Sequence, residues 1–138
     1  MIEGDLTTDL VKACKKSMTG AVIIKHADRS SYGIPDLSIT WQKATTWWEV
    51  KFFNNKPFNS PEQQEIMCQK LSTQGHCHYV IYKQQYAMRS ILIVNPFHIN
   101  EWDHAAVGAA AEFNHTWVAQ FIHALHLNAA SLLHLKGR

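Results

Sequence analysis

The fold depends on residues 33–53, which read GIPDLSITWQKATTWWEVKFF. Proline fixes its own φ and has no N–H donor, so Pro35 suits the position just before a strand. Residues 37–41 favour a short strand and residues 46–53 favour a second one, because both segments are rich in β-branched and aromatic side chains. Residues 42–45 then form the connection between two neighbouring strands.

Glu49 and Lys51 lie two residues apart within the second of these strands. Side chains alternate between the two faces of a strand, so both project on one side while Val50 and Phe52 project on the other. If the two strands pair, Asp36 at the start of the first strand comes close to Glu49 and Lys51. The sequence therefore predicts two carboxylates and one ammonium at a single place on the sheet.

This group of side chains matches the requirements of metal-assisted hydrolysis. Mg²⁺ prefers oxygen ligands and takes one or two carboxylates, keeping water in its remaining positions. The metal lowers the pKa of a bound water and neutralises the charge that develops on a phosphate, and a nearby lysine can orient that water. The alternative at this point is an ordinary surface Glu–Lys pair, which contributes little to stability.

The motif Gly33-Ile34-Pro35-Asp36, followed by Glu49-Val50-Lys51, resembles the active site of the PD-(D/E)XK nuclease superfamily, and within it the VRR-NUC family. Two weaker motifs support the resemblance. Ser60-Pro61-Glu62-Gln63 is similar to the family's Ser-Pro-x-Gln at the start of a helix, and Glu3 is similar to the acidic residue on its first helix. The resemblance covers residues 3–82.

The resemblance implies a site for Mg²⁺ or Mn²⁺. Asp36 and Glu49 would hold the ion, together with the main-chain carbonyl of Val50 and with the carboxylate of Glu3. Asp9 is the competing candidate for the acidic position on the first helix, because it lies within the helix predicted over residues 7–18.

The resemblance also assigns roles to two further side chains. Lys51 would position or activate the attacking water, and Gln63 would orient that water or a phosphate. Gln64 competes with Gln63, but the Ser-Pro-x-Gln register selects Gln63. Without the resemblance, Gln63 reads as a side chain of the first helical turn, after an N-cap at Ser60 and with Pro61 at the first helical position.

The fold implied by the resemblance is an α/β restriction-endonuclease-like core, a central mixed sheet flanked by helices in the order helix, three strands, helix, strand. Hydrophobic periodicity and β-forming residues predict elements in this order. Besides the two motif strands, the expected elements are a helix over 7–18, a strand over 21–25, a helix over 61–73, and strands over 76–83 and 90–94. Residues 1–96 would form the nuclease core.

Residues 97–138 are predicted to form a helical extension of the same single domain. Residues 97–108 suggest a connector or short helix, and residues 109–134 suggest a helix, either continuous or broken near Asn128. Apolar side chains recur along it near helical spacing. We expect this helix to pack on the sheet or to form a homodimer interface.

The 138 residues carry a formal net charge of +2, which by itself is too little to indicate nucleic-acid binding. A helix face rich in lysine is commonly a solvated face, but beside a nuclease centre it would contact the phosphate backbone. The side chains predicted to contact DNA in this way are Lys12, Lys15, Lys16, Lys25, Arg29 and Lys56.

The cysteines and histidines suggest no further chemistry. Three widely spaced cysteines without a Cys-x-x-Cys pair favour reduced thiols, and nine histidines at loose spacing favour surface or interface positions over a zinc site. No segment approaches the roughly 18 consecutive apolar residues of a membrane span, and the first residues lack the pattern of a secretory signal. We therefore expect a cytoplasmic protein without a membrane partner.

The expected function is that of a metal-dependent endonuclease hydrolysing DNA phosphodiester bonds. Small stand-alone VRR-NUC proteins, of the kind that phages and mobile elements encode, resemble dimeric enzymes that cut Holliday junctions. This implies branched DNA as the substrate and a homodimer as the assembly. Two alternatives remain: a restriction- or repair-type nuclease acting on duplex ends or flaps, and a catalytically inert nucleic-acid-binding or assembly protein of the same fold.

Overall fold

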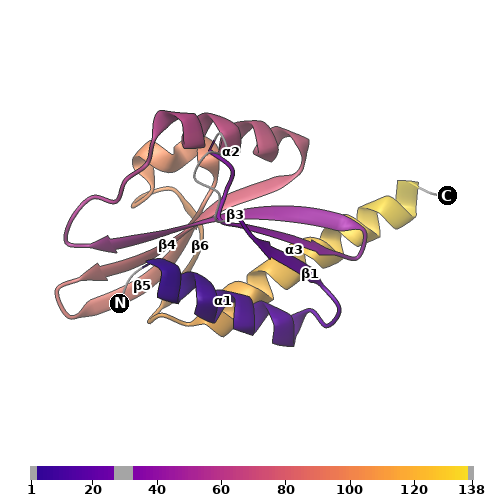
Figure 1. Ribbon diagram of the computed structural model, residues 1–138, viewed down its shortest axis with the longest axis horizontal. Coiled ribbons are helices and arrows are strands. Elements are labelled where there is room, and N and C mark those ends of the chain that lie inside the picture. The colour runs from indigo at the N-terminus through magenta and orange to yellow at the C-terminus, as the bar shows by residue number, and fades with distance from the viewer. Residues whose placement is uncertain (1–2, 27–32, 137–138) are drawn as a thin grey trace.

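The computed structural model describes residues 3–26 and 33–136, with side chains as far as Asn128. One six-stranded mixed sheet forms its centre, and helices cover both faces of the sheet (Figure 1). The protein therefore has an α/β fold, as the sequence predicts. In chain order the elements are α1 (Glu3–Ser17), β1 (Val22–Lys25), β2 (Leu37–Trp41), β3 (Ala44–Asn54), α2 (Glu62–Gln74), β4 (His76–Gln85), β5 (Met88–Val94), the 3-10 helix η1 (Pro96–Glu101), β6 (Ala106–Ala111) and α3 (His115–Lys136).

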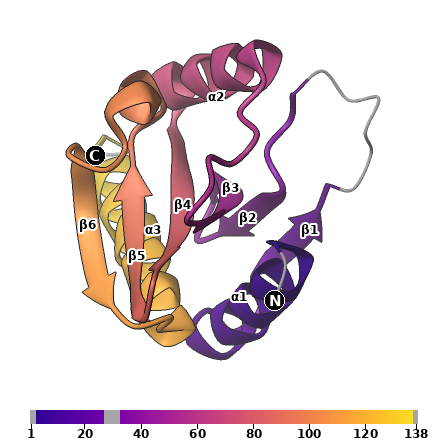
Figure 2. The ribbon, with the colours of Figure 1, turned by 90° about the vertical axis from the view of Figure 1, so that its left-hand side faces the viewer.

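The strands lie side by side in the order in which they occur along the chain, from β1 at one edge to β6 at the other (Figure 2). Each neighbouring pair is antiparallel except β3 and β4, which are parallel and are joined by α2. A parallel pair needs a crossover connection, which a helix commonly supplies. From α1 to β4 the order is thus helix, three strands, helix, strand.

A two-residue turn joins β2 to β3. The register pairs Trp41 with Ala44, and Gln42 and Lys43 between them have φ values of 53° and 64°. Positive φ at both central residues defines a type I′ turn, whose twist matches that of the flanking strands. The predicted four-residue connection is therefore too long, because β3 begins at Ala44 rather than at Thr46.

The two faces of the sheet carry separate hydrophobic cores. In Figure 1, α1 and α3 lie below the sheet and α2 lies above it with η1. Trp48 and Val50 of β3 point into the core between the sheet and helices α1 and α3, whereas Trp47 points toward α2. Because neighbouring side chains alternate, Glu49 and Lys51 share the α2 side of the strand with Trp47, as the sequence predicts.

Strand β6 is the main departure from the predicted fold, in which residues 97–108 form a connector or short helix and residues 109–134 a helix. Residues 106–111 instead pair antiparallel with β5. Tertiary pairing overrides the helix propensity of the alanines in this segment. The small residues also permit close packing under α3, because a Cβ on Gly108 would lie 2.9 Å from Cε2 of Phe121.

Helix α3 consequently begins at His115, six residues later than predicted, and continues to Lys136 without a break at Asn128. It packs against α1 and the same face of the sheet through buried side chains that include Val118, Ala119 and Ile122. The C-terminal segment therefore contributes both a strand and a helix to the fold.

Two helix starts also differ from the prediction. Helix α1 begins at Glu3 rather than at residue 7. Helix α2 begins at Glu62, and its N-cap is Pro61, which has no side-chain capping bond. The predicted N-cap, Ser60, instead donates its hydroxyl to Oε2 of Glu65 at 2.5 Å. Ser60 therefore stabilises the first turn of α2 from a position outside the helix.

The expected surface or interface position is wrong for His126, which is fully buried. Its Nε2 lies 2.9 Å from Oγ1 of Thr46, and its Nδ1 lies 3.0 Å from the carbonyl oxygen of Trp41. Both ring nitrogens are satisfied inside the fold, which explains how the imidazole is accommodated there. The cysteines are buried free thiols. Among the described helices, none is long and apolar enough to cross a membrane.

Candidate active site

The candidate site lies where β2 separates from β3. The last backbone pair between these strands is Leu37 with Trp48. Just beyond it, the Val50 N–H donates to Oδ2 of Asp36 at 3.0 Å, and the Asp36 N–H donates to Oε1 of Glu49 at 3.0 Å. These reciprocal bonds replace the strand pairing that ends there, and they hold both carboxylates in fixed positions.

Gly33 positions the loop that leads into Asp36. Its φ is +81°, a region that favours glycine, and an added Cβ would lie 2.7 Å from the carbonyl oxygen of Gln63 and 2.7 Å from Cα of Gln64. The Gly-Ile-Pro-Asp segment therefore lies directly against the first turn of α2. Pro35, which has no N–H to satisfy, is buried just before the strand.

Lys51 is held between two oxygen atoms on the same side of the sheet. Its Nζ lies 3.2 Å from Oε2 of Glu49 and donates to the carbonyl oxygen of Asn59 at 2.6 Å. Glu49 is only 3% exposed and Lys51 only 5% exposed. Removing such charges from water costs several kcal/mol per ion, so the pair is weak evidence for stability. Buried ionisable groups beside a cavity are instead typical of functional sites.

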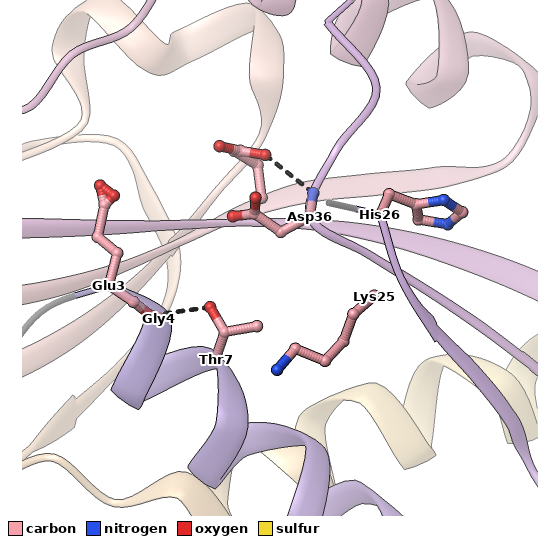
Figure 3. A pocket seen from close by; sticks show the side chains of 7 residues that line it. Glu3, Gly4, Thr7, Lys25, His26 and Asp36 are labelled. Carbon is pink, nitrogen blue, oxygen red and sulfur yellow. Dashed lines mark hydrogen bonds between the residues drawn. The ribbon is translucent and has the colours of Figure 1, made fainter. Parts of the chain in front are cut away.

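The carboxylates of Asp36 and Glu49 line a cavity of about 210 Å³ (Figure 3). Besides Asp36 and Glu49, the cavity is lined by Glu3, Gly4 and Thr7 from the first turns of α1, and by Lys25 and His26 at the end of β1. Strand β1 and helix α1 thus enclose the point at which β2 and β3 separate.

Of the two acidic residues considered on α1, Glu3 lines this cavity. The pKa of its carboxyl is raised by burial, while the nearby Lys51 ammonium lowers it and the Asp36 carboxylate raises it. Asp9 lies elsewhere: its Oδ2 is 3.7 Å from Nε2 of His115 on α3. The structure therefore brings Glu3 together with Asp36, Glu49 and Lys51.

Burial raises the pKa of both central carboxyls. For Asp36, hydrogen bonding from the Val50 N–H and the Lys51 charge oppose this effect. For Glu49, burial and the neighbouring Asp36 carboxylate raise the pKa to about 7, although Lys51 lowers it. Two adjacent buried carboxylates repel each other, so a bound cation would strongly favour the doubly ionised pair.

The donor set fits a hard divalent cation. In a strand, the N–H and C=O of one residue point to the same edge, so the Val50 carbonyl faces the side on which its N–H meets Asp36. With the carboxylates of Asp36, Glu49 and Glu3, this gives oxygen donors of the type preferred by Mg²⁺ and Mn²⁺. Within the described residues, no group of three Asp, Glu, His or Cys side chains is arranged so that it could hold a metal ion by itself. An ion that retains several water ligands does not require such a group.

Gln63 lies away from these residues. Its side chain is exposed and lines a separate hollow with Ile66, Met67 and Lys70. The competing Gln64 is half-buried, and its Oε1 is buried without a hydrogen-bond partner among the described atoms. The structure therefore brings neither amide into the cavity formed by the carboxylates.

His26 is a cavity residue that the sequence reasoning missed. The backbone N–H of His26 donates to the carbonyl oxygen of Asp36 at 2.7 Å. The Nε2 atom of its ring lies 2.8 Å from Oγ of Ser38, and the ring stacks on Trp47 with centroids 5.4 Å apart. The available signal was strand pairing: Lys25 lies opposite Leu37, which places the next residue beside Asp36.

The predicted DNA-contacting residues occupy different surroundings. Lys25 lines the cavity, whereas Lys12, Lys15 and Lys16 are exposed farther along α1. At about 1.5 Å per residue, Lys15 is roughly 18 Å along the axis from Glu3. Lysines in the last helical turn also interact favourably with the helix dipole. Lys56 is exposed in the loop after β3, and Arg29 lies outside the described residues.

Comparisons of the chain with protein-family models, curated proteins and solved structures found no match. The interpretation of the site therefore depends on its own geometry and chemistry.

Metal binding at this site should release protons. Because the pKa of Glu49 is about 7 without a metal, its carboxyl is mostly protonated at pH 6 and mostly ionised at pH 8. A cation must displace that proton, so Mn²⁺ affinity should rise about tenfold between these pH values. Isothermal titration calorimetry in buffers of different ionisation enthalpy would measure both the affinity and the released protons. Equal affinity at the two pH values, without proton release, would contradict this assignment.

The raised pKa of Glu49 also makes the stability of the metal-free protein depend on pH. Since the folded state binds a proton more tightly than the unfolded state, Glu49 makes the free energy of unfolding fall as pH rises from about 4.5 toward 7. Urea titrations in EDTA would measure this fall. The Glu49→Gln variant should reduce it and abolish the metal-linked proton release.

Proposed function

We propose that the protein is a metal-dependent nuclease of the PD-(D/E)XK superfamily, which hydrolyses DNA phosphodiester bonds. The reciprocal hydrogen bonding of Asp36 with Glu49 and Val50, with Lys51 directly beside Glu49, carries the proposal. It gives the two carboxylates, the carbonyl and the ammonium of the motif one common location. The order of elements from α1 to β4 also agrees with the restriction-endonuclease-like core expected from the sequence.

In this proposal Asp36 and Glu49 hold Mg²⁺ or Mn²⁺, together with the carbonyl oxygen of Val50 and with Glu3. The ion would lower the pKa of a bound water and neutralise charge on the phosphate. Lys51 has three ammonium hydrogens, and contacts to Glu49 and Asn59 account for two of them. The third is available to orient the water or to stabilise a phosphate oxygen.

DNA backbone binding would use positive charge around the cavity. Lys25 is the candidate best placed for this, because its Nζ donates to Oγ1 of Thr8 at 3.2 Å and its side chain lines the cavity. Contacts to phosphate position a nucleic acid without selecting a sequence, and they make binding depend on salt.

We also propose a homodimer. The outer strands β1 and β6 have no strand partner on their outer sides within the described residues, and Val22, Ile24 and Val107 on them are about half exposed. Uncovered strand edges are ready surfaces for pairing with another chain, and a two-fold dimer would present two sites to a branched duplex. Light scattering at micromolar concentration should give twice the mass of one chain. A monomer under these conditions would count against the dimer.

The nuclease proposal predicts that Asp36→Ala and Lys51→Ala each lower metal-dependent DNA cleavage by about 100-fold or more, because each removes a group that acts on the metal or the phosphate. Cleavage should be measured on linear, nicked, flap and four-way-junction DNA with Mg²⁺, Mn²⁺ or EDTA. Lys70→Ala is a suitable control, because Lys70 is exposed on α2 and does not line the cavity. Undiminished cutting by either site variant would reject the proposal.

A matched pair on α1 isolates the contribution of the metal ligands. Glu3→Gln should raise the Mg²⁺ concentration required for half-maximal cleavage by about tenfold, while Asp9→Asn should leave it unchanged. Both variants remove one carboxylate charge from the same helix, so general charge effects cancel. Equal responses would remove Glu3 from the metal site.

The substrate panel also separates the alternatives. Cleavage confined to branched DNA supports a junction-specific enzyme, whereas cleavage of duplex ends or flaps supports a restriction- or repair-type activity. Binding without metal-dependent cleavage of any of these DNAs supports a catalytically inert nucleic-acid-binding protein.

A further inference from the structure

A second hollow, of about 270 Å³, lies on the α2 side of the sheet. It is formed between the loop after β3, the start of α2, and η1, which packs beside α2 in Figure 2. The side chains that give it its chemical character are Phe53, Phe58, Trp102, Ser60, Glu65 and Asn100. None of the proposed metal ligands lines this hollow.

The hollow adjoins the candidate active site along β3. Lys51 and Phe53 lie on the same side of the strand, two residues and therefore about 7 Å apart. The loop connects the two places as well, because Lys51 is bonded to the carbonyl oxygen of Asn59, and the flanking residues Phe58 and Ser60 line the hollow. A group bound in the hollow would thus lie within reach of a nucleotide whose phosphate is at the active site.

Three aromatic rings line one part of the hollow. The Trp102 ring lies 5.3 Å from that of Phe53 and 5.6 Å from that of Phe58, centroid to centroid. The Lys83 ammonium lies 5.7 Å from the Trp102 ring centroid and is paired with Asp103, which helps to hold Trp102 in place. All three rings are only partly buried. Partly exposed aromatic rings of this kind bind nucleobases by stacking, irrespective of sequence.

The polar side of the hollow favours a base over a phosphate. The Glu65 carboxylate accepts a hydrogen bond from Ser60, and Asn100 contributes an amide. A carboxylate repels a phosphate but accepts hydrogen bonds from the amino groups of adenine, cytosine and guanine. Thymine offers only an imide N–H between two carbonyl oxygens, and a carboxylate repels those oxygens. The hollow is also smaller than the usual pocket for a drug-sized ligand, which suits one planar ring system.

We propose that this hollow binds one unpaired nucleobase of the DNA next to the cleaved phosphate. The base stacks on Phe58 and Trp102, and its amino group donates to Glu65. The inference rests on the proposed nuclease function and specifies its substrate, because a base inside a duplex cannot enter such a pocket without leaving the stack. DNA with an unpaired nucleotide at the cleavage position, as at a flap or an opened junction, is the substrate class selected.

The test is binding of a short single-stranded DNA in EDTA, measured by fluorescence anisotropy. Phe58→Leu keeps an apolar side chain but removes the stacking ring, and it should weaken binding about fivefold or more. Phe97→Leu is the matched control, because Phe97 is an exposed aromatic residue of η1 that does not line the hollow. An abasic nucleotide at the recognised position should weaken binding by wild type more than it weakens binding by Phe58→Leu, because the variant has already lost one of the contacts to the base. Equal effects of the two leucine variants, or a full additional loss on the abasic strand, would overturn the proposal.

Base preference gives a readout that does not depend on the Phe58 variant folding. Wild type should bind oligo-dA and oligo-dC more tightly than oligo-dT, and Glu65→Gln should reduce that difference. No preference in wild type, or one unchanged by Glu65→Gln, would contradict the proposed contact. Base binding without cleavage would reject the nuclease proposal alone, while cleavage unaffected by Phe58→Leu, with equal binding, would reject the nucleobase site alone.

Discussion

The hydrogen bond from the Val50 N–H to the Asp36 carboxylate is the interaction on which the candidate site depends. Strand β2 stops pairing with β3 at Leu37, which leaves the backbone of β3 without a strand partner on that side at Val50. The Asp36 side chain supplies the missing acceptor, and its own N–H is taken by Glu49. Because the end of a strand pair exposes backbone groups that must be satisfied, the fold fixes the carboxylates at the cavity that α1 and β1 line.

This arrangement has an electrostatic consequence. Glu3, Asp36 and Glu49 all have raised pKa values through burial, although the Lys51 charge lowers the pKa of each of them. Structural stability gives no reason to gather them, since desolvated charges are costly. A divalent cation would supply the compensating positive charge, and it would also attract a phosphate. The same residues that weaken the metal-free fold at neutral pH would therefore support the reaction.

Much of the fold and of the candidate site could be predicted from local sequence. Alternation along β3 correctly separated Glu49 and Lys51 from Val50, because period-two patterns survive tertiary packing. Strand β6 could not be predicted, since an alanine-rich segment becomes a strand only when β5 offers it an edge. His26 and the aromatic hollow were missed for the same reason. Their neighbours come from distant segments, and no local motif records those contacts.

Direct observation of the ion would decide whether these residues form a metal centre. In a crystal soaked with Mn²⁺, anomalous scattering should reveal a peak bounded by Asp36, Glu49 and the carbonyl of Val50, absent from a crystal of the Asp36→Ala variant. A fully occupied Mn²⁺ elsewhere, with none between these carboxylates at pH 8, would contradict the metal-dependent nuclease interpretation.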